Sequence, residues 1–215
     1  LSIGAPAAIL IERETGTVLY EKNADERREV ASITKLMTAL LVLEALDRDE
    51  IALTDSVQIS PRAAAMKGSQ ALLDANAVYP LEDLLRTTIM ASANDSAVAL
   101  SEYIAGSEEN FVDRMNRRAA ELGMTNTNYV NCTGYPQSGQ YTTARDVCRL
   151  CCEIAKHPRY NQYASVWIDK LTHPGGRVTD LTNTNRLVRF YEGCDGYKTG
   201  STDAAKYCLA ATAEK

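Results

Sequence analysis

The chain has 215 residues, of which 45% are hydrophobic and 24% are charged, proportions that are ordinary for a folded globular protein and unlike those of a disordered segment. Its formal net charge is −5 and no run of five or more basic residues occurs, so the electrostatic signature of a nucleic-acid-binding protein is missing. No stretch of about 18 apolar residues exists that could span a membrane.

The chain opens with a predicted β-hairpin. Residues 7–12 form a short apolar run, Glu14–Gly16 is a turn signal, and residues 17–21 form a second β-prone run. A helix follows, because Ile33, Leu36, Leu40 and their apolar neighbours recur at helical spacing. Ser32 is expected near the N-terminus of this largely buried helix.

The middle of the chain is predicted to be helical. Segments 81–90, 95–105, 108–122 and 143–156 carry apolar residues at helical spacing, whereas residues 124–142 are rich in Asn, Thr, Gly and Pro and indicate a loop. Two strands, 194–199 and 206–212, are predicted near the end of the chain, joined by residues 200–205.

This order predicts an α+β fold in which strands from both chain ends pair into one antiparallel sheet and a helical lobe is inserted between them. We expect residues 1–215 to form a single domain. Because the chain stops at residue 215 directly after a predicted strand, an odd place for a sheet to end, the sheet is expected to be truncated there.

Ser32 and Lys35 are three residues apart, so they share one face of a helix. A serine hydroxyl becomes a good nucleophile when a neighbouring base takes its proton, and a desolvated, neutral lysine can be that base. Alone this spacing is weak evidence, since a helix-capping Ser32 beside a solvated lysine gives the same letters.

Two further triplets could complete a catalytic site. Ser92-Ala93-Asn94 lies between two predicted helices and could place a hydroxyl and an amide there, although capping residues would look similar. Lys198-Thr199-Gly200 lies on a predicted strand, where a cation and a hydroxyl can hold an anionic substrate terminus and a glycine lets its backbone approach. An exposed lysine at the end of a strand is the alternative.

The three motifs occur in the order that is typical of penicillin-binding proteins and class A β-lactamases. With the sequence segments that surround these motifs, the chain is similar to the low-molecular-mass penicillin-binding proteins, specifically the serine D-alanyl-D-alanine carboxypeptidases. These segments include VASITKLMTALLVLE, ASANDSAVALSEYIAG and GCDGYKTGSTDAAKY. The resemblance covers nearly the whole chain. It implies a β-lactamase/transpeptidase-like fold with the site in a cleft between sheet and helical lobe.

The resemblance also implies roles. Ser32 would attack the carbonyl of the penultimate D-alanine of a peptidoglycan stem peptide, and Lys35 would accept its proton. Ser92 would pass that proton to the leaving D-alanine, Asn94 would bind the substrate backbone, and Lys198 would supply positive potential. Thr199, Gly200 and Ser201 would bind substrate, with the backbone N–H groups of Ser32 and Ser201 as the oxyanion hole.

Under this resemblance β-lactams should acylate Ser32, no metal or organic cofactor is expected, and the enzyme should act outside the cytoplasmic membrane. Any peripheral membrane attachment would go through a segment outside this chain. The sequence departs from the family pattern at three places. Ala93 replaces a usual glycine, Gln140 stands where a histidine is common, and Ala205-Lys206 replaces a more usual Ala-Gly.

Three alternatives remain. A class A β-lactamase needs a deacylating glutamate in a Glu-x-x-Leu-Asn loop, and the sequence contains no such motif. A D,D-endopeptidase of the same mechanism would carry the same motifs. An inactive homologue that binds cell-wall peptide is disfavoured by the intact motif residues.

The cysteines raise a separate question. Six are present, and Cys148, Cys151 and Cys152 fall within one predicted helix. For a zinc site the sequence lacks both a second, facing CxxC pair and a histidine at the spacing of a zinc finger. Buried thiols that pack on a helix face are therefore expected instead.

Overall fold

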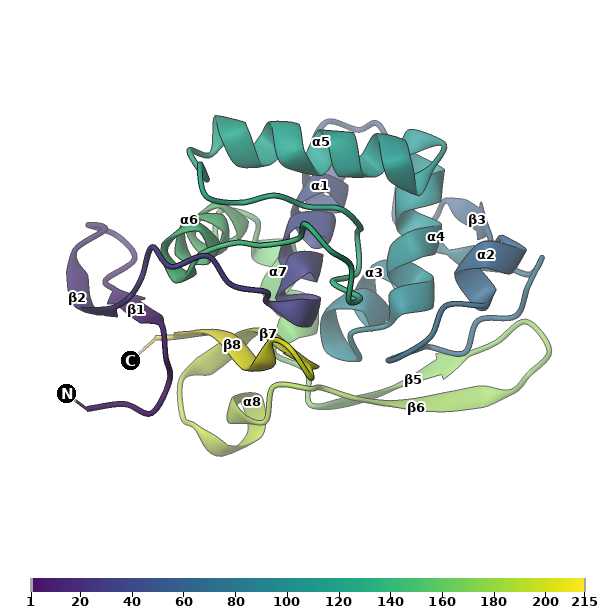
Figure 1. Ribbon diagram of the computed structural model, residues 1–215. Coiled ribbons are helices and arrows are strands. Elements are labelled where there is room, and N and C mark those ends of the chain that lie inside the picture. Colours follow the sequence, from purple (N-terminus) through teal and green to yellow (C-terminus); the bar gives the residue numbers. More distant parts are fainter. Residues whose placement is uncertain (1, 215) are drawn as a thin grey trace.

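The computed structural model describes residues 2–214, and the elements predicted from the sequence are present (Figure 1). The helices are the 3₁₀ turn η1 (Ala31–Thr34), α1 (Lys35–Asp47), α2 (Pro61–Ala64), α3 (Leu81–Met90), α4 (Asn94–Ala105), α5 (Glu108–Glu121), α6 (Ala144–Ile154), α7 (Pro158–Ala164) and α8 (Leu187–Phe190). The strands are β1 (Ala8–Ile11), β2 (Val18–Lys22), β3 (Ser56–Gln58), β4 (Val78–Pro80), β5 (Ile168–Thr172), β6 (Val178–Thr182), β7 (Cys194–Thr202) and β8 (Lys206–Ala213).

The long helices agree with the sequence pattern. The segment predicted at 81–90 is α3, and those predicted at 95–105, 108–122 and 143–156 are α4, α5 and α6 with ends shifted by one or two residues. Side-chain caps fix two starts: Ser107 accepts a hydrogen bond from the Asn110 N–H before α5, and Thr143 accepts one from the Asp146 N–H before α6. Such caps satisfy N–H groups that have no partner within the helix.

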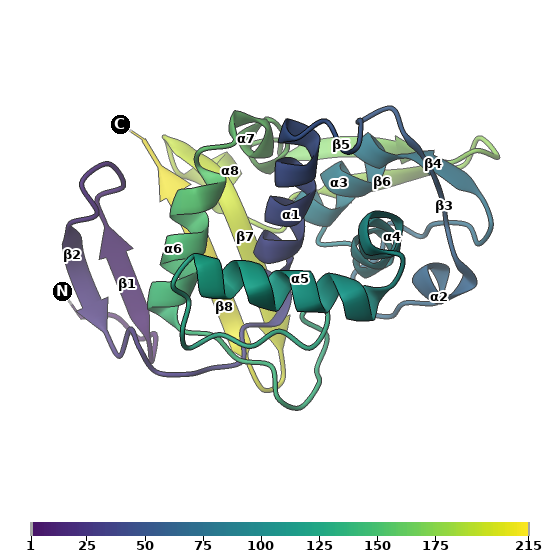
Figure 2. The same ribbon diagram turned by 90° about the horizontal axis from the view of Figure 1, so that it is seen from above.

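Helix α1 forms the centre of the molecule. It is apolar around its whole circumference, with Leu36, Met37, Leu40 and Leu43 at most 1% exposed. A helix of this kind has to be surrounded on all sides. Helices α3, α4, α5, α6 and α7 each contact it, and Figure 2 shows them arranged around its axis. Ser32, in η1, and Lys35, the first residue of α1, therefore stand at the start of this central helix.

The strands differ from the prediction in how they pair. Within residues 2–214, every strand pairs with the one nearest to it in the sequence, which gives four separate antiparallel pairs: β1–β2, β3–β4, β5–β6 and β7–β8. The expectation that strands from both chain ends hydrogen-bond into one sheet was wrong for the described residues. Helix α6 packs against both β1 and β8, so side-chain packing links the two terminal hairpins (Figure 2).

The α+β class itself is confirmed, since a helical lobe is inserted between terminal strands. Among the described residues, none of the helices combines the length and the apolar character needed to cross a lipid bilayer.

Candidate active site

The turn that carries Ser32 brings its hydroxyl to Lys35. Residues at i and i+3 of a 3₁₀ helix lie directly above one another, and η1 runs into α1 at Lys35. The Lys35 Nζ atom lies 3.0 Å from the Ser32 Oγ atom. The predicted contact between these two side chains is thus present.

The Lys35 amine is completely enclosed and has three oxygen partners. The residue is 1% exposed, and its Nζ lies 2.6 Å from Asn94 Oδ1 and 2.7 Å from the Thr133 carbonyl oxygen, besides its contact with Ser32. The Asn94 amide is oriented by its own Nδ2, which donates to the Lys67 carbonyl at 2.6 Å, so Oδ1 faces the lysine.

This arrangement decides how a neutral Lys35 must bond. A neutral amine has two N–H donors and one lone pair, while a carbonyl and an amide oxygen can only accept. Asn94 and Thr133 therefore take both N–H groups, and the lone pair is left for Ser32. The Ser32 hydroxyl must then donate its proton to Lys35, which is the geometry of a nucleophile with its general base.

Burial makes the neutral form accessible. It lowers the pKa of the Lys35 ammonium group from 10.5 to about 7, although the Asp95 carboxylate acts in the opposite direction. An enclosed site disfavours the charged form of an amine because the charge loses its hydration. Near neutral pH, Lys35 can consequently both accept and return a proton.

Ser92 lies on the short connection between α3 and α4. Its φ of 61° is in the left-handed region, which costs a non-glycine residue about 1 kcal/mol or more. Its hydroxyl is buried and has no hydrogen-bond partner among the described residues. Ser92 does not cap α4, whose N-cap is Ala93, so the capping interpretation of this motif does not hold for Ser92.

Lys198 lies on β7 and is 1% exposed. Its Nζ donates to the Thr199 carbonyl at 3.0 Å. Burial and then the positive charge of Lys35 lower its pKa well below 10.5, so the two amines lie close enough to repel one another. Because of that repulsion, a proton on one of the two amines is favoured when the other is neutral.

Gly200 places β7 against the Ser32 turn. A Cβ atom at Gly200 would lie 2.7 Å from the Val30 carbonyl oxygen and 2.9 Å from the Ser32 nitrogen. The sequence interpretation assigned this glycine to the approach of substrate, whereas the structure shows that it lets β7 pack onto the backbone of Ser32. Thr199 is half-buried and Ser201 is exposed; both lie on the strand face opposite Lys198 and Gly200.

Two residues of this site were missed in the sequence interpretation. The Thr133 carbonyl binds Lys35, and Gly134 packs so closely that a Cβ there would lie 1.9 Å from the Ala31 carbonyl oxygen. The Asn131-x-x-Gly134 motif could have predicted this turn, because the motif is typical of a tight turn whose glycine has positive φ.

The cysteines lie apart from this site, except for buried Cys132. All six are unpaired, and among residues 2–214 no group of three or more His, Cys, Asp and Glu side chains is placed to hold a metal ion. Cys148, Cys151 and Cys152 are all partly buried rather than fully buried as expected, and of these three Cys151 packs against the core of the molecule.

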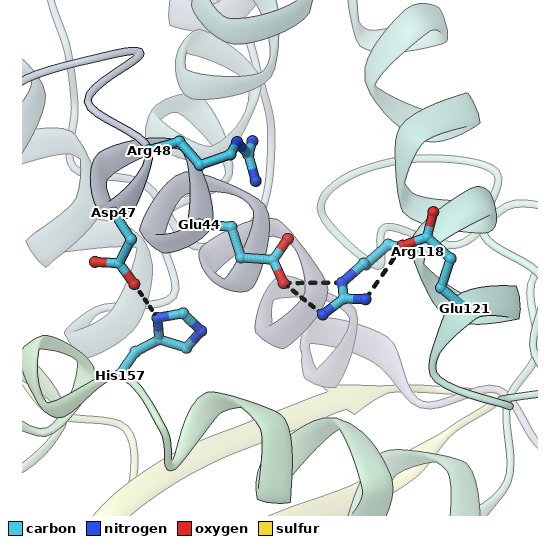
Figure 3. Close-up of a pocket in the computed structure, with 6 residues that line it drawn as sticks. All are labelled: Glu44, Asp47, Arg48, Arg118, Glu121 and His157. Carbon is cyan, nitrogen blue, oxygen red and sulfur yellow. Dashed lines mark hydrogen bonds and ion pairs between the residues drawn. The ribbon is translucent and has the colours of Figure 1, made fainter.

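A surface pocket of about 330 Å³ lies at the other end of α1, where Arg118 is held between Glu44 and Glu121 and His157 faces Asp47 (Figure 3). Because α1 rises about 1.5 Å per residue, this pocket is roughly 18 Å from the Ser32 turn. Arg118 and His157 pair with acidic residues of the pocket, whereas Arg48 pairs with Glu50 outside it, and these contacts link α1 to α5 and to the start of α7.

Comparison with known sequences identifies the family of the chain. A family model described as D-alanyl-D-alanine carboxypeptidase matches residues 1–215. The chain is 45% identical over 211 residues to D-alanyl-D-alanine carboxypeptidase DacF of Bacillus subtilis, covering 98% of this chain and 54% of that protein. It is 36% identical over 223 residues to DacC of Escherichia coli, covering 99% and 54%. The chain thus spans about half the length of these curated relatives.

Solved structures show the same fold. The D-alanyl-D-alanine carboxypeptidase DacD from Francisella tularensis superposes with a TM-score of 0.96 at 30% identity, over 100% of this chain and 64% of that one. The Streptomyces K15 DD-transpeptidase superposes with a TM-score of 0.92 at 29% identity, over 100% and 87%. The predicted β-lactamase/transpeptidase-like class is therefore confirmed. The match of the family model along the whole sequence, with these identities, shows that the chain belongs to the D-alanyl-D-alanine carboxypeptidase family of serine peptidases.

Proposed function

We propose that residues 1–215 form one catalytic domain that removes the terminal D-alanine from peptidoglycan stem peptides through an acyl-Ser32 intermediate. The observation that carries this proposal is the set of three oxygen partners around Lys35 Nζ, which leaves its lone pair for the Ser32 hydroxyl. The family of the chain supports the substrate class.

In the proposed acylation, Ser32 Oγ bonds to the carbonyl carbon of the penultimate D-alanine while Lys35 takes the hydroxyl proton. The carbonyl electron pair moves onto oxygen, and the N–H groups of Ser32 and Ser201 would donate hydrogen bonds to the resulting oxyanion. When the peptide bond breaks, the leaving amine needs a proton, and Ser92 would carry it there. The substrate would also give the buried Ser92 hydroxyl a hydrogen-bond partner that the described residues do not supply.

The remaining step is hydrolysis. Water attacks the acyl-Ser32 ester, Lys35 accepts a proton from that water, and the Ser32 hydroxyl is regenerated as the shortened peptide leaves. No metal ion or organic cofactor takes part in this scheme.

The substrate's free carboxylate is assigned to the Thr199 hydroxyl, while Lys198 on the other face of β7 supplies positive potential and Asn94 bonds to the substrate backbone. A carboxylate beside Lys198 favours the protonated form of that amine. Since Lys198 and Lys35 repel one another when both are charged, a protonated Lys198 in turn favours a neutral Lys35. Substrate binding would thus prepare the general base.

The proposed partners are peptidoglycan stem peptides and β-lactam antibiotics, which resemble the D-Ala-D-Ala terminus. The proposed location is the cell envelope, outside the cytoplasmic membrane, with any membrane attachment through a segment outside this chain.

A D,D-endopeptidase is the second candidate, because the chain is also 34% identical over 210 residues to the D-alanyl-D-alanine endopeptidase of Escherichia coli. A purified cross-linked muropeptide separates the two activities. A carboxypeptidase releases D-alanine from uncross-linked pentapeptide, whereas an endopeptidase converts the cross-linked dimer to monomers.

The proposal is tested by incubating the protein with benzylpenicillin and measuring its intact mass, then mapping the adduct by peptide digestion. We expect a single penicilloyl group on the peptide that contains Ser32, and release of D-alanine from a pentapeptide substrate. An adduct on another residue would refute the nucleophile assignment. Rapid hydrolysis of penicillin without an accumulating adduct would favour a β-lactamase.

Lys198→Ala is expected to slow acylation by a carboxylate-bearing β-lactam roughly 10–100-fold, because the positive potential that attracts the carboxylate is lost. The second-order rate constant for benzylpenicillin should be compared with that for its methyl ester. Wild type should discriminate between the two and the variant should not. Equal discrimination by both proteins would remove Lys198 from carboxylate binding.

A further inference from the structure

Glu108 is a buried carboxylate that lies outside all three sequence motifs. It is the first residue of α5 and is 7% exposed. Its Oε1 accepts a hydrogen bond of 2.9 Å from the Cys132 N–H, and its Oε2 pairs with the Arg62 guanidinium at 2.5 Å. A carboxylate is seldom buried without such partners, and here Arg62 on α2 neutralises it.

Cys132 begins the segment that reaches the active site, and it is held on both sides of its backbone. Its N–H donates to Glu108, and its carbonyl accepts a 2.6 Å hydrogen bond from the Thr38 hydroxyl of α1. Burial and the adjacent Glu108 carboxylate raise the pKa of the Cys132 thiol well above 9, so the thiol stays protonated. The residue is completely buried.

The next residues form a tight turn that ends at the general base. Asn131 Oδ1 accepts hydrogen bonds from the Thr133 N–H at 3.2 Å and the Gly134 N–H at 2.7 Å. The Thr133 carbonyl then accepts from Lys35 Nζ at 2.7 Å. Asn131 shapes this turn internally, but only outside contacts can place it relative to Lys35.

We propose that Glu108 is a positioning residue for acylation: by anchoring the Cys132 N–H, it holds the Thr133 carbonyl against Lys35 and thereby keeps the lysine lone pair aimed at Ser32. This inference rests on the proposed function, and it adds a residue that does not touch the reacting atoms. If the anchor is lost, the 131–134 turn can move away, one Lys35 N–H loses its acceptor, and the amine can rotate away from Ser32. Misplacement of a reacting group by about 1 Å can cost on the order of 100-fold in rate.

A purely structural role for Glu108 would have a different signature, and the chain offers a matched control. Asp146 lies on the first turn of α6, is 1% exposed and pairs with Arg149 at 2.8 Å. Its Oδ2 accepts from the Asn126 N–H at 2.9 Å, as Glu108 does from Cys132. Asp146 anchors Asn126 at the start of the same 124–142 loop, whereas Glu108 anchors Cys132, the residue directly before Thr133. Loss of the Asp146 anchor, remote from the turn that binds Lys35, should therefore affect stability more than the acylation rate.

The experiment measures acylation by benzylpenicillin under single-turnover conditions, which separates the rate at saturation from the half-saturating concentration, together with urea unfolding. Glu108→Gln is expected to lower the saturating rate about 3–10-fold, because the amide keeps an acceptor for Cys132 but loses the pairing with Arg62. Glu108→Leu, which has no acceptor, is expected to lower it about 30–100-fold. The half-saturating concentration should change less than about 3-fold in both.

Asp146→Asn should reduce the urea midpoint by an amount similar to Glu108→Gln while leaving the saturating rate within about 2-fold of wild type. If Glu108→Leu does not fold, the two isosteric amide variants decide the question alone. The inference is overturned if Glu108→Gln acylates at the wild-type rate, or if Asp146→Asn slows acylation equally. Lack of an adduct on folded wild-type protein would instead refute the proposed function.

Discussion

Lys35→Met is expected to slow the acylation of Ser32 by about 10²–10⁴-fold, because the substitution removes the proposed general base. Methionine is similar in length and apolar, so it suits the enclosed site, where Lys35 is 1% exposed. The rate of adduct formation with benzylpenicillin, followed by intact mass, measures the effect. Ser32→Ala gives the background, and Lys170→Met, on an exposed position of β5, controls for loss of a lysine.

The pH dependence of the same reaction provides a second measurement. Lys35 accepts a proton only when it is neutral, and its pKa is lowered to about 7 by burial. The wild-type acylation rate should therefore rise with pH through about 7 and level off above it, while the residual rate of Lys35→Met should lack this step. A wild-type rate that is constant between pH 6 and 9 would contradict the assignment, as would near-normal acylation by the methionine variant.

The long helices could be predicted closely from their apolar spacing, with side-chain caps at α5 and α6, whereas the short helices α2, α7 and α8 were not predicted. In α5, the capping residue Ser107, two glutamates in the first turn and buried Phe111 and Met115 all indicate the same element. The contact between Ser32 and Lys35 was equally predictable, since residues three apart on a helix face the same way.

Long-range contacts made through the backbone could not be predicted in this way. The carbonyl of Thr133 binds Lys35 across 98 positions in the sequence, and any residue type would supply the same carbonyl oxygen. The contact of Glu108 with the Cys132 N–H could not be predicted either. Acidic residues are common in the first turn of any helix because they interact favourably with the helix dipole, so Glu108 does not stand out in the sequence.

The strand pairs that the sequence did not reveal are short or mostly exposed. In β5 and β6, Leu171 and Leu181 are the buried residues and both strands have one face open to solvent, so the alternation is weak. The placement of the two terminal hairpins also depends on tertiary packing: α6 contacts both, and the local pattern of each strand cannot show that.

Gly134→Ala is expected to reduce the free energy of unfolding by about 3–5 kcal/mol and to abolish acylation at Ser32. A methyl group there would lie 1.9 Å from the Ala31 carbonyl oxygen and 2.9 Å from the Ser32 nitrogen, and both are backbone atoms that cannot rotate away. The Ser32 turn also has little room to move, because β7 packs against it at Gly200, where a Cβ would lie 2.7 Å from the Val30 carbonyl oxygen.

Gly106→Ala separates this clash from the conformational strain of the glycine. Gly134 and Gly106 share a φ of 78°, but a Cβ at Gly106 would meet no described atom within 4 Å. Gly106→Ala should therefore lower the free energy of unfolding by about 1 kcal/mol, which is the strain of an alanine in the left-handed conformation. Urea unfolding of both variants, with penicillin labelling of the folded fraction, measures the difference. Equal destabilisation of the two variants would mean that the Ser32 turn can shift to make room for a methyl group at residue 134. The tight packing of the 131–134 turn against the Ser32 turn would then not be what fixes the position of Ser32.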